Sequence, residues 1–161
     1  MDIFLGIDPG SKRIGYGLIS KKGSTLSFLS AGILQINAEN SFDQKQKDLL
    51  SIRDQISELI DIHQPKSLAI EKLFFSKNKK TVFAVSESRG VVLLSAAEKK
   101  IKVQEFSPNE IKLAVTGYGL ADKAAVSKMV KLILKKPDLN LIDDAIDALA
   151  VAITASQKTL S

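Results

Sequence analysis

The chain has 161 residues, of which 45% are hydrophobic, and this is enough to fill the core of a single domain over residues 1–161. It contains no cysteine, which excludes disulfides, zinc–thiolate sites and thiol nucleophiles. The net charge of +5 is modest, and no apolar run has the length of a membrane helix or the pattern of a signal peptide, so we expect a cytoplasmic protein without membrane contact.

The first part of the chain predicts three strands followed by a helix. Short apolar runs over residues 3–7, 14–19 and 25–36 are separated by the turns Pro9-Gly10 and Lys21-Lys22-Gly23, which is typical of a meander. Apolar residues then recur at helical spacing from Ser41 to His63. We expect an amphipathic helix there, ended by Pro65.

The rest of the chain predicts two more strands and four more helices. The apolar run over residues 67–71 follows a helix, so we expect a buried strand that lies parallel to an earlier one. Ser107-Pro108-Asn109-Glu110 has the pattern of a capping box. The remaining elements are a strand over residues 101–106 and helices over residues 81–99, 109–115, 122–134 and 141–156. These elements predict one α/β domain with a mixed sheet.

The positive charge is concentrated in the middle of the chain. Residues 1–71 carry 8 basic and 9 acidic side chains, residues 72–136 carry 14 and 5, and residues 137–161 carry 1 and 4. Such clustering is typical of a surface that faces phosphates, although solvated helix lysines give the same pattern. Charge alone therefore favours nucleic-acid binding without establishing it.

Two acids stand where predicted strands end. Asp8 ends the first strand and Glu71 ends the crossover strand. If these strands are parallel neighbours, both carboxylates emerge at the carboxyl edge of the sheet, where α/β proteins place their ligands. A structural role explains each residue equally well, because Asp8-Pro9-Gly10 is favourable turn chemistry and Glu71 can be an ordinary charge at a strand end.

The last helix supplies two further acids. Asp147 is the one polar residue between Ala145 and Ile153, and an ionised acid without a partner would be costly there. Asp144 lies three residues earlier, on the same helical face, although an acid at that point also complements a helix N-terminus. We expect the packing stripe of this helix to consist of Ile142, Ile146, Leu149 and Ile153.

These four carboxylates predict a metal site with oxygen ligands. The chain has one histidine, His63, which we expect in a solvated loop. Carboxylates without thiols or imidazoles suit Mg²⁺, with Mn²⁺ as a substitute. Two such ions would activate water for attack on a phosphodiester and stabilise the leaving oxygen.

The motifs of the chain, in their order, resemble those of the RuvC family of Holliday-junction resolvases over nearly the whole length. The first block is Leu5-Gly6-Ile7-Asp8-Pro9-Gly10-Ser11 followed by Gly15-Tyr16-Gly17. The second is Ile70-Glu71-Lys72-Leu73-Phe74-Phe75, Lys77-Asn78 and Ser88-Arg89-Gly90. The third runs from Val115-Thr116-Gly117 through Ala121-Asp122-Lys123, and the fourth is Asp144-Ala145-Ile146-Asp147-Ala148-Leu149-Ala150. Four blocks in order are far more specific than any one of them.

The resemblance implies an RNase H-like fold, with a mixed five-stranded sheet flanked by helices. It implies a metal-dependent endonuclease that resolves Holliday junctions by paired symmetric nicks during recombination and DNA repair, as a homodimer working with RuvA and RuvB. The family's metal-binding and catalytic quartet corresponds to Asp8, Glu71, Asp144 and Asp147. Its DNA-binding residues correspond to Phe74, which would lie at the opened centre of the junction, and to Lys77, Lys112 and Lys123.

Two hypotheses concern neighbouring apolar residues. Adjacent residues in an extended segment point in opposite directions, so Phe74 would face the DNA while Phe75 fills the core. Val82, Val85 and Val92 on the helix over residues 81–99 are candidates for the dimer contact, although core packing explains them equally well.

Three other functions are compatible with parts of the sequence. One is an RNase H-like nuclease of the resolvase-like family linked to ribosomal RNA processing. Another is an actin-like kinase or ATPase, suggested by Asp8-Pro9-Gly10-Ser11, but those enzymes need two such domains. The third is a non-catalytic junction-binding module, which offers no reason for four acids.

Overall fold

The computed structural model describes residues 1–37, 41–73 and 79–158 of the chain. The strands are β1 (Asp2–Pro9), β2 (Ile14–Lys22), β3 (Thr25–Leu34), β4 (Ser67–Glu71) and β5 (Lys102–Phe106). The helices are α1 (Phe42–His63), α2 (Lys79–Glu98), α3 (Pro108–Thr116), α4 (Lys123–Ile133) and α5 (Asp143–Gln157). All ten elements were predicted, with bounds that differ by no more than two residues at either end, except that β2 runs three residues further than predicted.

The five strands form one mixed sheet in the order β3-β2-β1-β4-β5. The pairs β1–β2 and β2–β3 are antiparallel, and β4 lies parallel to both β1 and β5. The predicted crossover is therefore confirmed, with α1 connecting the meander to β4. This order, with helices on both faces, confirms the mixed-sheet α/β fold that the sequence predicts and agrees with the RNase H-like fold that the family resemblance implies.

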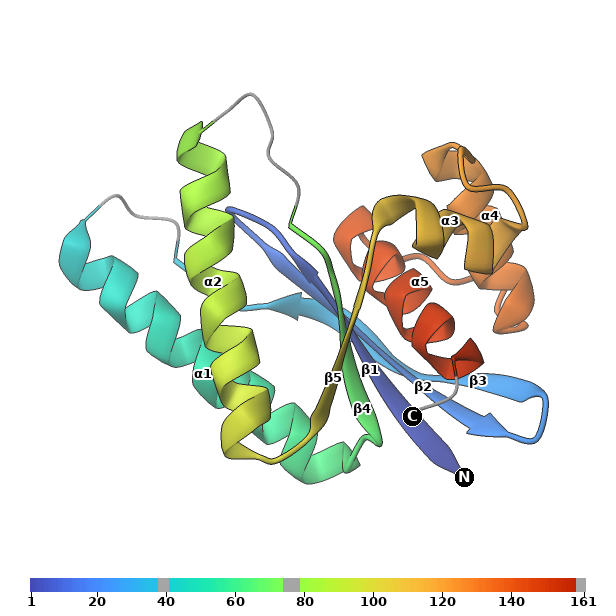
Figure 1. Cartoon of the computed structure of the whole chain (residues 1–161), viewed down its shortest axis with the longest axis horizontal. Helices are drawn as coiled ribbons and strands as arrows, with labels where there is room; N and C mark the ends of the chain where they lie inside the picture. The colour runs from blue at the N-terminus through green and yellow to red at the C-terminus, as the bar shows by residue number, and fades with distance from the viewer. Residues whose placement is uncertain (38–40, 74–78, 159–161) are drawn as a thin grey trace.

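The alternation of side chains along β1 divides the core into two layers. Leu5 and Ile7 point to the face covered by α1 and α2, where they pack against Ile52 and Ile56. Phe4 points to the opposite face, into the cluster formed with α3, α4 and α5. Figure 1 shows these two groups of helices on either side of the sheet.

Helix α5 lies directly on the backbone of β1 and β2 because glycines face it. A Cβ atom on Gly6 would lie 2.1 Å from the carbonyl oxygen of Ala148, and one on Gly15 would lie 2.0 Å from that of Asp144. No side chain fits at such distances, so these glycines permit the close approach. The approach brings the first turns of α5 over the carboxyl end of β1.

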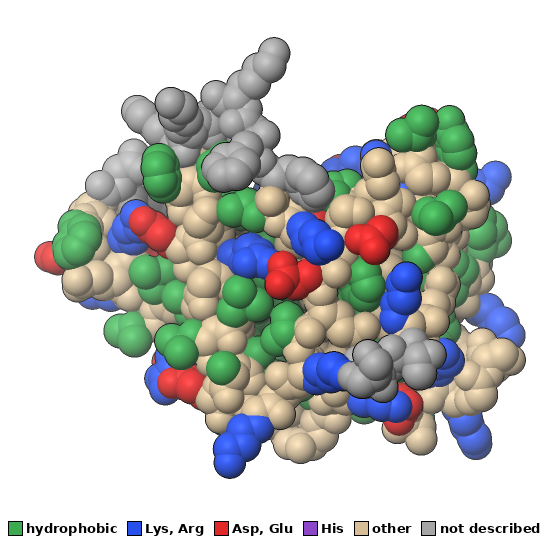
Figure 2. Space-filling model, in the orientation of Figure 1, with side chains coloured by type: hydrophobic (Ala, Val, Ile, Leu, Met, Phe, Trp, Pro, Cys, Tyr) green, Lys and Arg blue, Asp and Glu red, His purple; other side chains and the backbone are tan. Residues whose placement is uncertain are grey.

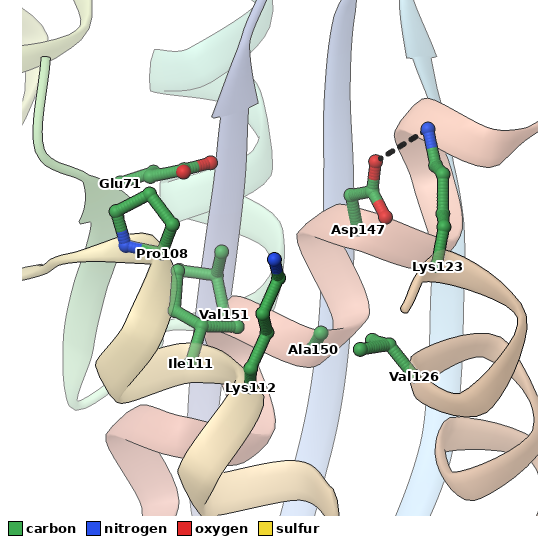
Figure 3. Close-up of a pocket in the computed structure, with 9 residues that line it drawn as sticks. All are labelled: Glu71, Pro108, Ile111, Lys112, Lys123, Val126, Asp147, Ala150 and Val151. Atoms are coloured by element: carbon green, nitrogen blue, oxygen red, sulfur yellow. Dashed lines mark ion pairs between the residues drawn. The ribbon is translucent and has the colours of Figure 1, made fainter. Parts of the chain in front are cut away.

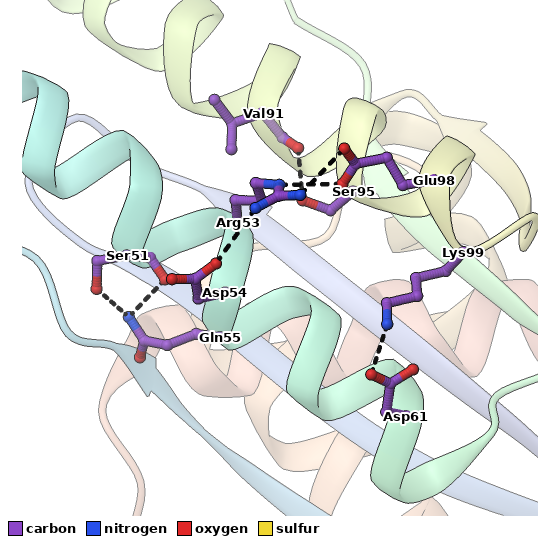
Figure 4. Close-up of polar contacts among 9 residues, drawn as sticks. All are labelled: Ser51, Arg53, Asp54, Gln55, Asp61, Val91, Ser95, Glu98 and Lys99. Atoms are coloured by element: carbon purple, nitrogen blue, oxygen red, sulfur yellow. Dashed lines mark hydrogen bonds and ion pairs between the residues drawn. The ribbon is translucent and has the colours of Figure 1, made fainter.

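Ion pairs connect α1 to α2 along their exposed sides. The Arg53 guanidinium donates to both carboxylate oxygens of Glu98, at 3.0 and 3.2 Å, and Lys99 Nζ lies 2.5 Å from Asp61 Oδ2. Figure 4 shows these contacts bridging the two helices. Each exposed pair contributes at most about 1 kcal/mol, so the apolar residues packed between the helices contribute most to this contact.

Three local predictions are corrected by the structure. Ile142 does not belong to the packing stripe of α5, because it is the N-cap residue and is 41% exposed. His63 is the last residue of α1 rather than a loop residue. Val92 is fully buried among residues of the α1 and α2 layer, so it cannot contact a second chain.

The helix caps account for where α1 and α3 begin. The Ser41 side chain accepts a hydrogen bond from the backbone N–H of Gln44. The capping box of Ser107 and Glu110 is present in full, as predicted. Among the residues that the structure describes, no helix combines the length and the apolar character needed to cross a membrane.

Candidate active site

The ends of β1 and β4 bring the first two predicted acids together. Ile7 pairs with Ile70 in the parallel register, so Asp8 and Glu71 are the next residues on adjacent strands. Asp8 shares its face of the sheet with Gly6, and both therefore point toward α5. The two carboxylates lie at the carboxyl edge, as the strand order predicts.

Helix α5 adds the other two acids from above the sheet. Asp144 lies in its first turn and Asp147 one turn later, which places both side chains on the helix face near Asp8. Burial raises the pKa of Asp8 to about 7, and the negative charges of Asp147, Glu71 and Asp144 contribute to the shift. The four predicted acids therefore form one electrostatically coupled group.

Two of the other acids in this group also have raised pKa values. Burial and the charge of Asp147 raise the pKa of Glu71, and Lys112 partly offsets them. Burial raises the pKa of Asp147 as well, against the opposing effect of Lys123. These buried acids lack full compensation by protein cations, which is the electrostatic condition that a bound cation relieves.

A cleft of about 320 Å³ opens beside these acids. Its lining includes Glu71, Asp147, Lys112 and Lys123, and apolar side chains of α3, α4 and α5 form its walls. Figure 3 shows Lys112 rising from α3 between Glu71 and Asp147, with Lys123 beyond Asp147. The cleft thus combines acids that suit a metal ion with lysines that suit a phosphate.

The positions of both lysines follow from helix starts next to the sheet edge. Phe106, the last residue of β5, pairs with Glu71, and α3 begins two residues later, which brings Lys112 beside that acid. Lys123 is the first residue of α4, after the N-cap Asp122. Figure 2 shows that other Lys and Arg side chains are spread over the drawn face without forming one continuous patch.

Two cations are paired directly with the acids of α5. Lys123 Nζ lies 3.2 Å from Asp147 Oδ2 and 3.7 Å from Asp143 Oδ2. Arg13 Nε lies 3.4 Å from Asp144 Oδ2. Arg13 was not among the predicted site residues; the signal that could have found it is the strand alternation, which, extended one residue before β2, places residues 13 and 15 on the same face.

The donor chemistry fits a hard divalent cation. Four carboxylates supply oxygen ligands for Mg²⁺ or Mn²⁺, and no thiol competes. In the described part of the chain, no three acidic or histidine side chains already converge as ligands of a single ion. Binding an ion would therefore require carboxylates of α5 to turn away from Arg13 and Lys123.

Some predicted residues cannot be placed, and one acid beside the site was not predicted to belong to it. Phe74, Phe75 and Lys77 lie outside the described residues. Asp143 is described, and its side chain is 78% exposed. Asp143 thus fits the simpler role of an acid at a helix N-terminus, and its charge also contributes to the raised pKa of Asp147. Its neighbour Asp144 is 29% exposed and belongs to the coupled group.

Comparison with known proteins points to one family. Residues 4–155 match the family described as crossover junction endodeoxyribonuclease RuvC. The protein of that name from Petrotoga mobilis is 43% identical over 150 residues, covering 93% of this chain and 90% of that protein. The one from Natranaerobius thermophilus is 42% identical over 155 residues, covering 96% and 94%.

Solved structures agree with this match. The structure of Thermus thermophilus RuvC has a TM-score of 0.86 and 27% identity, and the comparison covers 96% of this chain and 93% of that one. The structure of T. thermophilus RuvC in complex with Holliday junction substrate has a TM-score of 0.88 and 26% identity, with coverage of 97% and 93%.

Proposed function

Because this chain belongs to the RuvC family of crossover junction endodeoxyribonucleases, we propose that it resolves Holliday junctions by paired symmetric nicks during recombination and DNA repair. The observation that carries the proposal is the coupling of Asp8, Glu71, Asp144 and Asp147 at one edge of the sheet. A non-catalytic binding module would have no use for four clustered acids.

In this proposal the four carboxylates hold Mg²⁺, or Mn²⁺ in its place, as two ions in each site. Bound metal would activate water and stabilise the leaving oxygen of the phosphodiester. Asp8 and Glu71 are fixed by the sheet, and Asp144 and Asp147 by α5, so the ligand set combines two rigid elements. The apolar walls of the cleft limit the access of bulk water and strengthen the local electrostatics.

Lys112 and Lys123 serve as phosphate contacts in this proposal. Both line the cleft, and each lies close enough to an acid to oppose the rise in its pKa. Changing either to Ala should slow cutting and reduce the salt slope of junction binding by about one unit. Lys128→Ala, at an exposed position farther along α4, is the matched control.

Phe74 and Lys77 complete the proposed DNA contacts, on the basis of family resemblance. Phe74 follows the strand-end acid Glu71 by three residues in the sequence. We assign Phe74 to stacking on a base unpaired at the junction centre, Lys77 to the backbone and Phe75 to packing. All three residues lie outside the part of the chain that the structure describes.

The protein acts as a two-fold homodimer in this proposal, since matched cuts in two strands need two acidic sites. Val82 and Val85 are half-buried. An exposed stripe on α2 offers more surface to a second chain, so we propose the contact there. The members of this stripe recur on one helix face and are Phe83, Gly90, Leu94 and Ala97. Phe83 is 70% and Leu94 53% exposed, and the space beside Gly90 is open.

Family resemblance also supports RuvA and RuvB as partners, a cytoplasmic location and one domain over residues 1–161.

A single set of assays tests the activity against its alternatives. The purified chain is given a synthetic four-way junction, a structured ribosomal RNA fragment, and ATP, each with Mg²⁺. Symmetric junction nicks without RNA cutting or ATP hydrolysis support the proposal, whereas junction binding without cutting favours a binding module.

A further inference from the structure

Arg13 is the one cation of the β1–β2 turn that contacts the acidic group. Its Nε atom lies 3.4 Å from Asp144 Oδ2, with 58% of the Arg13 side chain and 29% of the Asp144 side chain exposed. Lys12, its neighbour, instead lines a separate groove beside the N-terminal ends of α1 and α2. Two adjacent basic residues of one turn thus face different surroundings.

The backbone dictates this placement of Arg13. Pro9 pairs with Ile14, which leaves residues 10–13 as a tight turn. A Cβ on Gly10 would lie 2.2 Å from the Arg13 carbonyl oxygen, so the turn closes without room for a side chain there. Ile14 is buried on the α1 and α2 face, and alternation therefore sends Arg13 and Gly15 toward α5.

We propose that Arg13 is a positioning residue that exchanges partners during the reaction. In the metal-free protein it is the counter-ion of Asp144. When metal ions and DNA bind, the carboxylate turns to the metal and the guanidinium binds a phosphate of the strand to be cut. This inference rests on the proposed nuclease function and adds to it a DNA contact from the sheet side of the site.

The energetics favour such an exchange. An ion pair this exposed is weak, so a divalent cation can displace it readily. The released guanidinium remains charged, and its planar fork matches two phosphate oxygens in a way that lysine cannot. Lys112 and Lys123 approach from α3 and α4. Arg13 would thus hold the DNA strand from the other side of the acids.

The first experiment measures Mn²⁺ binding to the DNA-free protein by calorimetry. Arg13→Gln removes the internal competitor for Asp144 and should tighten Mn²⁺ binding about two- to fivefold, in keeping with the strength of an exposed ion pair. Lys12→Gln removes the same charge from the same turn and should leave Mn²⁺ binding unchanged. Equal affinities of the two variants would overturn the counter-ion role.

The second experiment measures the salt dependence of four-way junction binding in Ca²⁺, with product gels to exclude cutting. Arg13→Gln should reduce the salt slope by about one unit, and Lys12→Gln should not. Arg13→Lys should keep most of the slope but cut more slowly than the wild type. Equal slopes for the Gln variants would overturn the phosphate contact. A wild-type protein that neither binds nor cuts the junction would instead refute the proposed function. The Mn²⁺ titration uses no DNA, so it tests the counter-ion role of Arg13 separately.

Discussion

At the residue scale, the ionised carboxylate of Asp8 is proposed to bind metal, but it destabilises the metal-free fold. Burial and three neighbouring acids raise its pKa to about 7 from an ordinary value of 3.8. Between about pH 4 and pH 7, Asp8 is therefore protonated in the folded protein but ionised in the unfolded chain. The contribution of Asp8 to stability is greatest below this range and is lost as the pH rises through it.

Asp8→Asn should consequently stabilise the metal-free protein at neutral and higher pH. The gain in the free energy of unfolding should grow from about pH 4 to pH 7 and then level off, at a few kcal/mol or less. Urea unfolding of both proteins in EDTA across this range measures the gain. Adding Mg²⁺ should stabilise the wild type at pH 8 more than the variant. A pH-independent difference between the two would contradict the coupling of Asp8 to its neighbours.

The adjacent aromatics Phe74 and Phe75 should respond to substitution in different assays. Base stacking is worth about 1–3 kcal/mol, so Phe74→Ala should slow cutting of an intact junction by roughly ten- to hundredfold. A junction already unpaired at its centre should recover most of the rate. Phe75→Ala should instead lower the melting temperature, because it empties an aromatic packing position. The reverse pattern would show that the two side chains have exchanged roles.

At the element scale, the packing of α5 on the sheet positions half of the acidic group. Gly15→Ala would place a Cβ atom 2.0 Å from the Asp144 carbonyl oxygen, so α5 must move away from β2. We expect a loss of about 1–3 kcal/mol in the free energy of unfolding and slower cutting, because Asp144 moves with the helix.

Gly119→Ala is the matched control, since its Cβ meets only ordinary contacts, the nearest at 3.5 Å. Urea unfolding and junction nicking are measured for both variants. If Gly15→Ala folds and cuts as well as this control, the close approach of α5 does not position the site.

Local patterns in the sequence predicted most features of the structure, whereas features that depend on distant residues were missed. Hydrophobic periodicity and capping residues are local signals, and they identified all ten elements and the cap at Ser107. The convergence of Asp8 and Glu71 followed from the crossover rule. Arg13 was missed because its partner Asp144 is distant in sequence. Ile142 was misassigned because helical spacing does not reveal where the first turn begins.

At the scale of the whole molecule, one chain supplies one acidic group, whereas symmetric resolution needs two. The exposed stripe on α2 provides the proposed contact between chains. Replacing Phe83 and Leu94 together by Glu would place charges in that contact, so we expect a folded monomer that nicks single strands but no longer makes paired cuts. Sedimentation velocity and circular dichroism test both parts of this expectation.

The control for the dimer prediction is Leu50→Glu, an equally polar change at a position of α1 that is 59% exposed. This variant should sediment as the wild type does. A wild-type chain that is monomeric both free and on junction DNA would contradict the homodimer, and a dimeric double variant would place the contact elsewhere.

Metal-dependent junction cutting by the coupled carboxylates can be tested directly, because α5 carries neighbouring acids that are expected to differ in their role. The measurement is the nicking rate of a synthetic four-way junction in Mg²⁺ by the wild type, Asp147→Asn and Asp143→Asn, with junction affinity determined in parallel. We expect Asp147→Asn to bind as tightly but to cut about 10²-fold more slowly or worse. Asp143→Asn, whose side chain is 78% exposed, should cut at nearly the wild-type rate. Wild-type cutting by Asp147→Asn would contradict a catalytic role for the coupled carboxylates.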